Sequence, residues 1–307
     1  MKAKIIDGIK IAEGIKSALR REIEIIAGTS GGKTPNLAAV QVGGSEASLS
    51  YIKNQKLNCE KLGISYTLLQ FHDQTREEEI IEAIKKAGCD KNVTGIIVHM
   101  PLPGNLNPLN IRLAIEPSKD VEGITPANLG LLFYSGVKPL VSPCTALAVM
   151  ECIKKAGVNI TGKEVVIVGH SDIVGKSLCL TMLSSLRGSA TPTVCHIATK
   201  NLAAHTRRAD ILIVAVGKAG FIKGSMIKKG ATVIDVGINR KPLPSKKAAG
   251  KQGGEGSFKI TGDVAFDEAA KTAGSITPVP GGVGPVTTAM LLKNLVALYK
   301  LQNPKSR

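Results

Sequence analysis

Residues 163–177 read KEVVIVGHSDIVGKS, and this stretch decides the expected fold of the second half of the chain. Its apolar run predicts a buried strand, Gly169 ends the strand, and a helix is expected to follow. A strand, a glycine turn and a helix N-terminus together suit a phosphate anion, because backbone N–H groups point outward and glycine permits close approach. The spacing of Gly169, Ser171 and Gly175 differs from the usual G-x-G-x-x-G. A tight turn without a ligand therefore stays open as an alternative.

The stretches on either side of this turn continue an α/β rhythm. A helix is expected around residues 146–156, and further strands near 193–196, 210–214 and 231–236. The strand after a nucleotide-binding turn ends beside the adenine ribose, where NAD enzymes usually carry Asp or Glu. Residues 195–200 read CHIATK and contain no acid. Lys200 or His170 would suit a 2′-phosphate, but neither decides the cofactor.

The first half of the chain shows the same alternation. Ile11, Ile15, Leu19 and Ile23 recur every four residues, which predicts one face of an opening helix. Strands are expected at 37–43, 66–71 and 95–100, with helices at 48–62 and 77–86 between them. This order indicates parallel strands joined by crossover helices. A proline- and glycine-rich segment at 278–285 precedes a last helix ending near residue 299, and the Lys/Gly-rich residues 241–259 predict a mobile surface loop.

Composition narrows the class of partner. The chain has 307 residues and a net charge of +16, which suits a ligand with several negative charges, such as a nucleotide, a polyglutamyl tail or a nucleic acid. Only four Tyr and five Phe are available for base stacking, and no basic run is interleaved with aromatic residues. We therefore expect no nucleic-acid partner.

The cysteines and the apolar runs indicate the compartment. The six cysteines form no C-x-x-C pair, which favours reduced thiols over disulfides or a zinc site, so no metal is expected. The N-terminal residues lack an apolar signal core, and no apolar run reaches the roughly 20 residues of a membrane span. These features predict a soluble cytoplasmic protein without a membrane association.

Six segments carry a resemblance to a known family. They are Ser48-x-x-Tyr51, Pro101-Leu102-Pro103, 169–177, DVGIN at 235–239, GDV at 262–264 and TPVPGGVGP at 277–285. On these segments the chain resembles the bifunctional methylenetetrahydrofolate dehydrogenase/methenyltetrahydrofolate cyclohydrolase family over nearly its whole length.

The resemblance implies both a fold and an activity. It implies two α/β domains with a cleft between them: a folate-binding catalytic domain from both chain ends (1–141 and 281–307) and a Rossmann-like NAD(P)-binding domain (142–280). It also implies a homodimer that acts on tetrahydrofolate derivatives, which we expect to be polyglutamylated. The family oxidises 5,10-methylenetetrahydrofolate by hydride transfer to NAD(P)+, and then hydrolyses the methenyl product to 10-formyltetrahydrofolate.

The resemblance further implies the site residues. The expected catalytic residues are Tyr51, Gln55 and His99, and the expected substrate-binding residues are Ser48, Glu122, Pro280, Gly281, Gly282 and Val283. The expected cofactor-binding residues are Gly169, His170, Ser171, Ile173, Gly175, Ile197, Gly237 and Ile238.

Three of these positions depart from the family pattern. The family carries Lys where this chain has Gln55, Gln where it has His99, and Asp where it has Glu122. Hydride transfer mainly needs alignment of the reacting carbon with the nicotinamide, whereas hydrolysis needs a titratable group. An amide cannot exchange protons near neutral pH. We therefore expect a dehydrogenase whose cyclohydrolase step is lost or weakened.

Several alternatives stay open. His99 could restore hydrolysis, since imidazole titrates near neutrality, or it could be a structural residue. The chain could also be a non-catalytic folate-binding paralogue, or act on another pterin carrier through Glu122. His170 and Ile197 replace the Arg and Ser that often accompany NADP, so NADP is expected and NAD remains possible. Cys144 is expected to be packed rather than nucleophilic.

Overall fold

The structure is a computed structural model, and it describes residues 2–44, 46–134, 137, 139–185, 187–242 and 258–304, without the side chains of 46–51 and 242. Its contacts divide the chain into two units. Unit 1 comprises Met1–Ile11 and Ala148–Val286, and unit 2 comprises Ala12–Leu147 and Thr287–Arg307. The boundaries fall within three helices: α1 (Gly8–Thr29), α6 (Cys144–Lys155) and α10 (Val283–Gln302).

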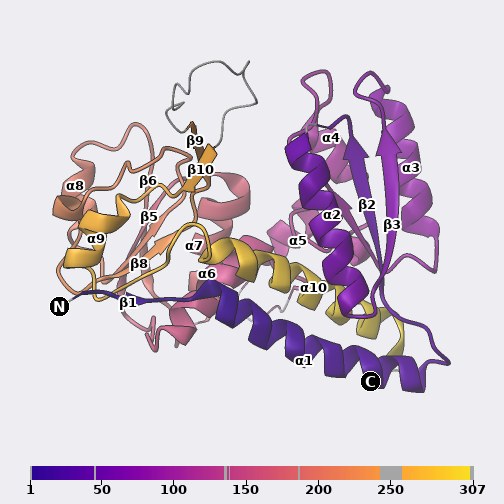
Figure 1. The fold of residues 1–307 in the computed structure, drawn as a ribbon, viewed down its shortest axis with the longest axis horizontal. Helices are drawn as coiled ribbons and strands as arrows, with labels where there is room; N and C mark the ends of the chain where they lie inside the picture. Colours follow the sequence, from indigo (N-terminus) through magenta and orange to yellow (C-terminus); the bar gives the residue numbers. More distant parts are fainter. Residues whose placement is uncertain are drawn as a thin grey trace, which may run out of the picture. The chain divides into compact units, whose positions relative to one another are not determined.

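Unit 1 is built on a six-stranded sheet in the order β1-β11-β8-β7-β5-β6, and every neighbouring pair of strands is parallel. Figure 1 labels β1, β5, β6 and β8 of this sheet. Its strands are β1 (Lys4–Ile5), β5 (Glu164–Val168), β6 (Thr191–Cys195), β7 (Ile211–Val214), β8 (Thr232–Asp235) and β11 (Ser275–Ile276). The central strands are continuous apolar runs because helices and loops bury both faces of a parallel sheet.

The register aligns the carboxyl ends of the central strands. Val168 of β5 pairs with both Cys195 of β6 and Val214 of β7, and Val214 pairs in turn with Asp235 of β8. The loops that follow these four strands therefore leave from one edge of the sheet. Ligands of open α/β sheets bind at this edge.

Short helices and a hairpin complete unit 1. A π-helical turn (Asp172–Lys176) leads into α7 (Ser177–Leu183), and the other helical segments are α8 (Leu202–Thr206), a 3-10 turn (Gly224–Met226) and α9 (Phe266–Thr272). Strands β9 (Asn239–Pro242) and β10 (Phe258–Thr261) pair antiparallel. One core cluster joins Val168, Leu212 and Val233 of the sheet with Ala269 and Ala270 of α9.

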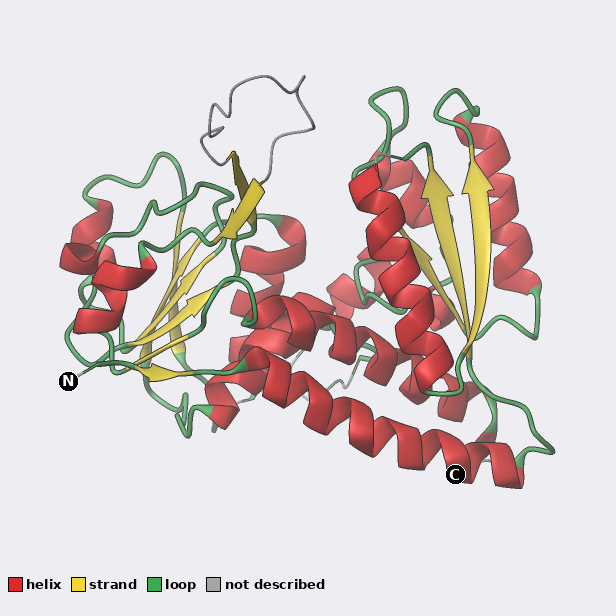
Figure 2. Cartoon of the chain, viewed as in Figure 1, coloured by secondary structure: helices red, strands yellow, loops and turns green. Residues whose placement is uncertain are grey.

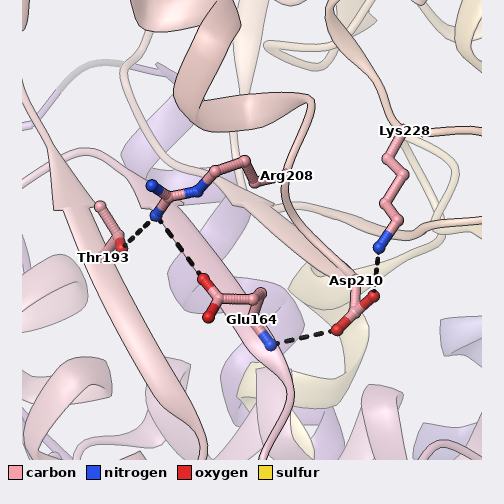
Figure 3. A network of polar contacts seen from close by, with 5 residues as sticks. All are labelled: Glu164, Thr193, Arg208, Asp210 and Lys228. Carbon is pink, nitrogen blue, oxygen red and sulfur yellow. Dashed lines mark hydrogen bonds and ion pairs between the residues drawn. The ribbon is translucent and has the colours of Figure 1, made fainter.

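The amino-terminal edge of the same sheet carries a network of opposite charges (Figure 3). The Lys228 Nζ donates to Asp210 at 2.7 Å, and the other oxygen of Asp210 accepts the backbone N–H of Glu164 at 3.1 Å. The Arg208 guanidinium lies 3.6 Å from the Glu164 carboxylate and donates to Thr193 at 3.4 Å. These contacts tie the starts of β5 and β7 to the middle of β6.

Unit 2 has a three-stranded parallel sheet in the order β3-β2-β4, drawn in yellow between red helices in Figure 2. Its strands are β2 (Asn36–Val42), β3 (Ser65–Phe71) and β4 (Gly95–Val98). Its helical segments are α2 (Glu46–Lys61), α3 (Glu77–Cys89), α4 (Pro108–Leu113), a 3-10 turn (Pro117–Lys119) and α5 (Pro126–Leu131).

The two faces of this sheet have different neighbours. Ala38, Val40 and Val42 pack with Ile80 and Ile84 of α3, so even-numbered residues of β2 face α3. Side chains alternate along a strand, so odd-numbered residues of β2 point to the opposite face. On that face Tyr66 of β3, which pairs with Leu37, contacts α2 through Gln55. We call this side the α2 face.

The predicted strands and long helices are confirmed to within a few residues. The expected loop 241–259 is flanked by the β9–β10 hairpin, and its residues 243–257 lie outside the described part of the chain. Two strands of two residues each, β1 and β11, were not expected, because so short a run has no detectable period. Within the described ranges, no helix is long and apolar enough to cross a membrane.

Candidate active site

The glycine turn after β5 is shaped by close backbone contacts. Gly169 has a φ of +126°, and a Cβ built on it would lie 2.2 Å from the carbonyl oxygen of Ala215. A Cβ on Gly175 would lie 2.0 Å from the carbonyl oxygen of Gly169. The helix therefore packs directly against the end of the strand, as in dinucleotide-binding turns. The Ser171 hydroxyl accepts the N–H of Val174 at 3.3 Å and caps the helical turn, in which Ile173 is partly buried.

Two imidazoles meet beside this turn. His170 follows β5 and His196 follows β6, and their ring centroids are 5.2 Å apart. The N–H of Gly169 donates to the carbonyl of Cys195 at 2.9 Å, which holds the two loops together. Ile197 is fully exposed. The side chains at this corner are thus histidines and an apolar residue, with no carboxylate at residues 195–200 to bind a ribose 2′-hydroxyl.

A cavity of about 160 Å³ lies at the carboxyl end of β8. One side is formed by residues 235–238, which include Gly237 and the two-thirds-exposed Ile238. The other side is formed by residues 278–285, which include Pro280, Gly281, Gly282 and Val283. The structure therefore brings four residues expected to contact folate and two expected to contact the cofactor around one cavity of unit 1.

Gln55 of α2 lies on the α2 face of the unit 2 sheet. Its side chain is only 3% exposed, and its Oε1 accepts the Tyr66 hydroxyl at 3.0 Å. Its Nε2 is buried without a hydrogen-bond partner among the described residues. A buried donor of this kind is rare unless a ligand or water completes it. The side chains of Ser48 and Tyr51, one to two turns earlier on α2, lie outside the described part of the chain.

His99 lies on the same face at the carboxyl end of β4. Its N–H donates to the carbonyl of Val40 at 2.9 Å, so its side chain stands in the same row as Gln41 of β2. Burial lowers the pKa of His99 to about 4, so the imidazole is neutral at pH 7. Gln41 is 3% exposed, and its Oε1 has no hydrogen-bond partner in the described structure. The α2 face therefore carries three buried polar side chains: Gln41, Gln55 and His99.

Glu122 lies elsewhere in unit 2. It lines a small cavity with Val98, Met100 and Arg112, and Val98 belongs to the α3 face of the sheet. Burial raises the pKa of Glu122 to about 7, the Asp120 carboxylate adds to this, and Arg112 opposes it. Glu122 is thus the predicted site residue of unit 2 that titrates near neutral pH.

The loop that carries Glu122 is held by buried hydrogen bonds. Asp120 accepts the N–H groups of Gly123 at 2.9 Å and Thr125 at 2.7 Å, and the side-chain amide of Asn128 at 2.9 Å. The backbone carbonyl of Glu122 accepts the N–H of Cys144. Burial, chiefly, raises the pKa of Cys144 well above its ordinary value. A buried, protonated thiol fits the expectation that Cys144 is packed rather than nucleophilic.

Sequence reasoning missed three polar residues near these sites: Gln41, Asp235 and Asp263. Gln41 has a detectable signal, because it interrupts the otherwise apolar strand at residues 37–42. Asp235 and Asp263 were quoted only as parts of motifs. Both are buried, at 4% and 0% exposed, and both bind backbone N–H groups at the carboxyl edge of the unit 1 sheet.

The residues of unit 1 fit a dinucleotide. The glycines of the turn leave no Cβ between the backbone and a pyrophosphate, and the cavity at β8 lies at the same edge of the sheet. No group of three or more His, Cys, Asp or Glu side chains in the described ranges is arranged to hold a metal ion. All six cysteines are free.

Comparison with known proteins gives matches along the whole chain. Residues 6–122 match the family model for the tetrahydrofolate dehydrogenase/cyclohydrolase catalytic domain, and residues 143–303 match that for the NAD(P)-binding domain of the same family. A protein of Acetivibrio thermocellus named bifunctional protein FolD is 44% identical over 98% of this chain and 99% of its own length.

Solved structures agree with these matches. A Trypanosoma brucei methylenetetrahydrofolate dehydrogenase-cyclohydrolase, complexed with NADP and an inhibitor, has a TM-score of 0.90 and 34% identity, covering 98% of each chain. A bifunctional FolD enzyme from Campylobacter jejuni has a TM-score of 0.87 and 37% identity, covering 97% of this chain and 99% of that one.

Proposed function

The chain belongs to the tetrahydrofolate dehydrogenase/cyclohydrolase family, and from this premise we propose that it oxidises 5,10-methylenetetrahydrofolate with NAD(P)+ while its hydrolytic step is lost or much weakened. Members of this family are NAD(P)-dependent enzymes of one-carbon metabolism. The proposal thus separates two steps that the family usually combines.

The cavity at the carboxyl end of β8 carries the dehydrogenase part of the proposal. The turn 278–285 and residues 235–238 line it together, and they include four residues expected to bind the substrate and two expected to bind the cofactor. Hydride transfer requires the donor carbon and the acceptor ring to be within van der Waals distance, with water excluded. A shared cavity lined mainly by glycine, proline and apolar residues, with Asp235 as its charged member, supports both requirements.

The turn at 169–175 supports the cofactor. When bound, the nicotinamide accepts the hydride, and the residues of the chain hold the dinucleotide in the position that this transfer requires. Gly169 and Gly175 permit the close approach, and Ser171 fixes the helical turn. We favour NADP, because residues 195–200 supply no carboxylate and His170 and His196 offer nitrogen donors to a 2′-phosphate. NAD remains the alternative.

The α2 face supports the loss of hydrolysis. Water attack on the methenyl carbon needs a group that takes up and releases a proton near pH 7. Gln55 is an amide and cannot do so. His99 is a weak base, since burial lowers its pKa to about 4. Gln55 Nε2 and Gln41 Oε1 have no hydrogen-bond partner among the described side chains, and both can still orient a polar edge of the substrate.

Three other hypotheses compete with this proposal. In one, the enzyme is fully bifunctional and binding of substrate restores the basicity of His99. In another, the chain is a non-catalytic folate-binding paralogue. In the third, Glu122 adapts the enzyme to a different pterin carrier.

An assay of both steps separates the main proposal from these rivals. Purified protein is mixed with methylenetetrahydrofolate and NADP+ or NAD+, and reduced cofactor and methenyltetrahydrofolate are followed together by absorbance. We expect the two to accumulate in step. Removal of methenyltetrahydrofolate faster than its spontaneous hydrolysis contradicts the loss of the second step. Failure to reduce either cofactor favours the paralogue or another carrier.

Replacement of Gln55 by Lys tests the cause of the loss. We expect Q55K to gain cyclohydrolase activity, and Lys56→Gln on the same helix is the control. Lys56 is exposed and lies 3.9 Å from Glu60, so K56Q should leave both activities unchanged. If Q55K shows no gain, the missing Lys is not the reason for the weak second step.

Further assignments follow from membership of the family. We propose that residues 1–141 and 281–307 form the folate-binding part and 142–280 the nucleotide-binding part, except that residues 4–5 join the nucleotide-binding sheet as β1. Tyr51 and Ser48 are proposed to lie beside the substrate. A homodimer, a polyglutamylated substrate and a cytoplasmic location are also predictions. Sedimentation of the purified protein tests the first of these.

A further inference from the structure

Two buried carboxylates lie side by side at the carboxyl edge of the unit 1 sheet. Asp235 ends β8, and Asp263 follows β10. The N–H of Asp263 donates to Asp235 Oδ1 at 3.0 Å, and the N–H of Val264 donates to Asp235 Oδ2 at 2.9 Å. The two acids are thus joined through the backbone.

The pair ties together the loops around the cavity. Asp235 also accepts the N–H of Gly237 at 3.0 Å. Asp263 accepts the N–H groups of Val216 at 2.6 Å and Gly217 at 2.9 Å, and the side-chain amide of Asn239 at 2.8 Å. The loops after β7 and β8 are therefore both anchored to carboxylate oxygens.

Glycines let the backbone touch these carboxylates directly. A Cβ on Gly237 would lie 2.1 Å from the Asp263 carboxyl carbon, and a Cβ on Gly262 would lie 1.9 Å from Asp235 Oδ2. Gly237 and Asp235 both line the cavity of about 160 Å³. Asp235 therefore borders the cavity directly, and the Asp263 carboxylate lies against Gly237, which also lines it.

Within the described residues, no cation neutralises the pair. Neither carboxylate forms an ion pair, whereas Asp210 in the same sheet does. Burial, with a smaller contribution from Asp263, raises the pKa of Asp235 to about 6, although three N–H bonds oppose the rise. Two like charges kept buried without a counter-ion are costly, and such arrangements concentrate at functional sites.

The position of the pair indicates which ligand group it meets. In a dinucleotide-binding sheet the phosphates lie at the glycine turn, here after β5, and the two halves of the dinucleotide extend to opposite sides. The adenine half extends toward β6, so the nicotinamide half extends toward β7 and β8. The oxidised nicotinamide ring carries a positive charge, and the reduced ring is neutral.

We propose that Asp235 and Asp263 are positioning residues that form an anionic wall at the cavity, which favours the oxidised, cationic nicotinamide ring over the reduced, neutral ring. This inference rests on the proposed use of a nicotinamide cofactor. A unit charge a few ångströms from the ring in a partly solvated site changes affinity by a factor of about three to ten. The effect is on the ratio of two affinities, which loop anchoring alone would leave unchanged.

The test measures dissociation constants of NADP+ and NADPH for the wild type, Asp263→Asn and Asp210→Asn. In D263N the amide oxygen can still accept from Val216 and Gly217, and the new amide nitrogen can donate to Asn239 after the Asn239 side chain flips. Asp210→Asn removes the same charge from the opposite edge of the sheet. We expect the preference for the oxidised form to fall by roughly three- to tenfold in D263N and to stay constant in D210N.

Two outcomes overturn different claims. Equal weakening of NADP+ and NADPH binding in D263N shows that the pair only anchors loops, and refutes the inference. If the wild type binds neither form, nor NAD+ or NADH, the proposed function itself fails.

A measurement on the wild type covers the case in which D263N does not fold. The ratio of the two affinities is compared at pH 7.5 and pH 5.5. Asp263 is the charged group that faces Asp235, and the other residues lining the cavity have no titratable side chain. Lys218 and Arg240 on neighbouring segments form no ion pair with either acid in the described structure, and Lys and Arg side chains keep their charge in this range. The preference for the oxidised form should fall at pH 5.5, and a constant ratio contradicts the inference.

Discussion

At the amino-terminal edge of the unit 1 sheet Asp210 is paired with Lys228 (Figure 3), whereas at the carboxyl edge Asp235 lies beside another carboxylate, Asp263. Both acids accept backbone N–H groups, so they differ in their charged neighbours rather than in their hydrogen bonds. The hydrogen bond from Lys228, above all, lowers the pKa of Asp210, and burial raises that of Asp235. One edge is arranged for stability, and the other keeps an unfavourable charge where ligands bind.

The largest loss of stability is expected when one methyl group is added between the carboxylates and the backbone. We expect Gly262→Ala to lower the free energy of unfolding by about 3 kcal/mol or more, because the new Cβ would overlap Asp235 Oδ2. Urea denaturation measures this. Gly14→Ala is the control, since nothing lies within 4 Å of its Cβ in helix α1, and it should be neutral or slightly stabilising. A G262A protein as stable as the wild type means that the packing at this edge is loose.

The two edges should respond to pH in opposite directions. The pKa of Asp235 is raised from 3.8 to about 6, so the folded state binds more protons than the unfolded state between these values. Its contribution to stability is therefore present at low pH and declines by on the order of 3 kcal/mol as pH rises through about 6. The pKa of Asp210 is lowered, so its contribution is present above pH 3.8 and is lost as pH falls below that value.

Unfolding curves of the wild type and D210N at several pH values check these signs. In acid, D210N should lose less stability than the wild type, because the carboxylate of Asp210 is absent. Between about pH 4 and pH 6 its stability should still decline as that of the wild type does, because Asp235 is unchanged. If D210N instead removes that decline, the assignment of the two effects is reversed.

A smaller difference in stability is expected at pH 7.5 between two variants that each remove one carboxylate charge. We expect D210N to cost about 1 kcal/mol, since it weakens the bond from Lys228 and the bond from the Glu164 N–H. D263N should cost less, because it keeps the bonds from Val216 and Gly217, loses only the 3.4 Å bond from Asn239 to the Thr261 carbonyl when Asn239 flips, and removes a like-charge repulsion. Thermal unfolding of the two variants side by side decides this. A D263N protein much less stable than D210N means that the buried pair stabilises the fold.

The smallest expected effect is the loss of stability on removing Lys228, the exposed partner of Asp210. Lys228 is 46% exposed at its side chain, so Lys228→Ala should cost about 0.5 kcal/mol, and less in about 1 M salt. Unfolding at low and high salt measures this. A cost that stays the same at high salt indicates packing by the Lys228 stem rather than charge.

The fold was largely predictable because its signals are local. The alternation of strands and helices, the glycine turn at 169–175 and the segment 277–285 are each written in consecutive residues, and the structure places the expected elements within a few residues. The pairing of β1 with β11 was not predictable, because residues 4–5 and 275–276 are too short to show a period and meet only in the folded chain.

The residue types of the candidate site were predictable from the sequence, but their burial and protonation states were not. The sequence alone determines that position 55 is an amide, that position 99 is an imidazole, and that residues 195–200 carry no acid. Only the tertiary structure decides that His99 has a pKa of about 4, that Glu122 has a pKa of about 7, and that Asp235 and Asp263 share one buried edge. The reason is physical: proton affinity depends on burial and on neighbours that are distant in sequence, and both come into being only when the chain folds.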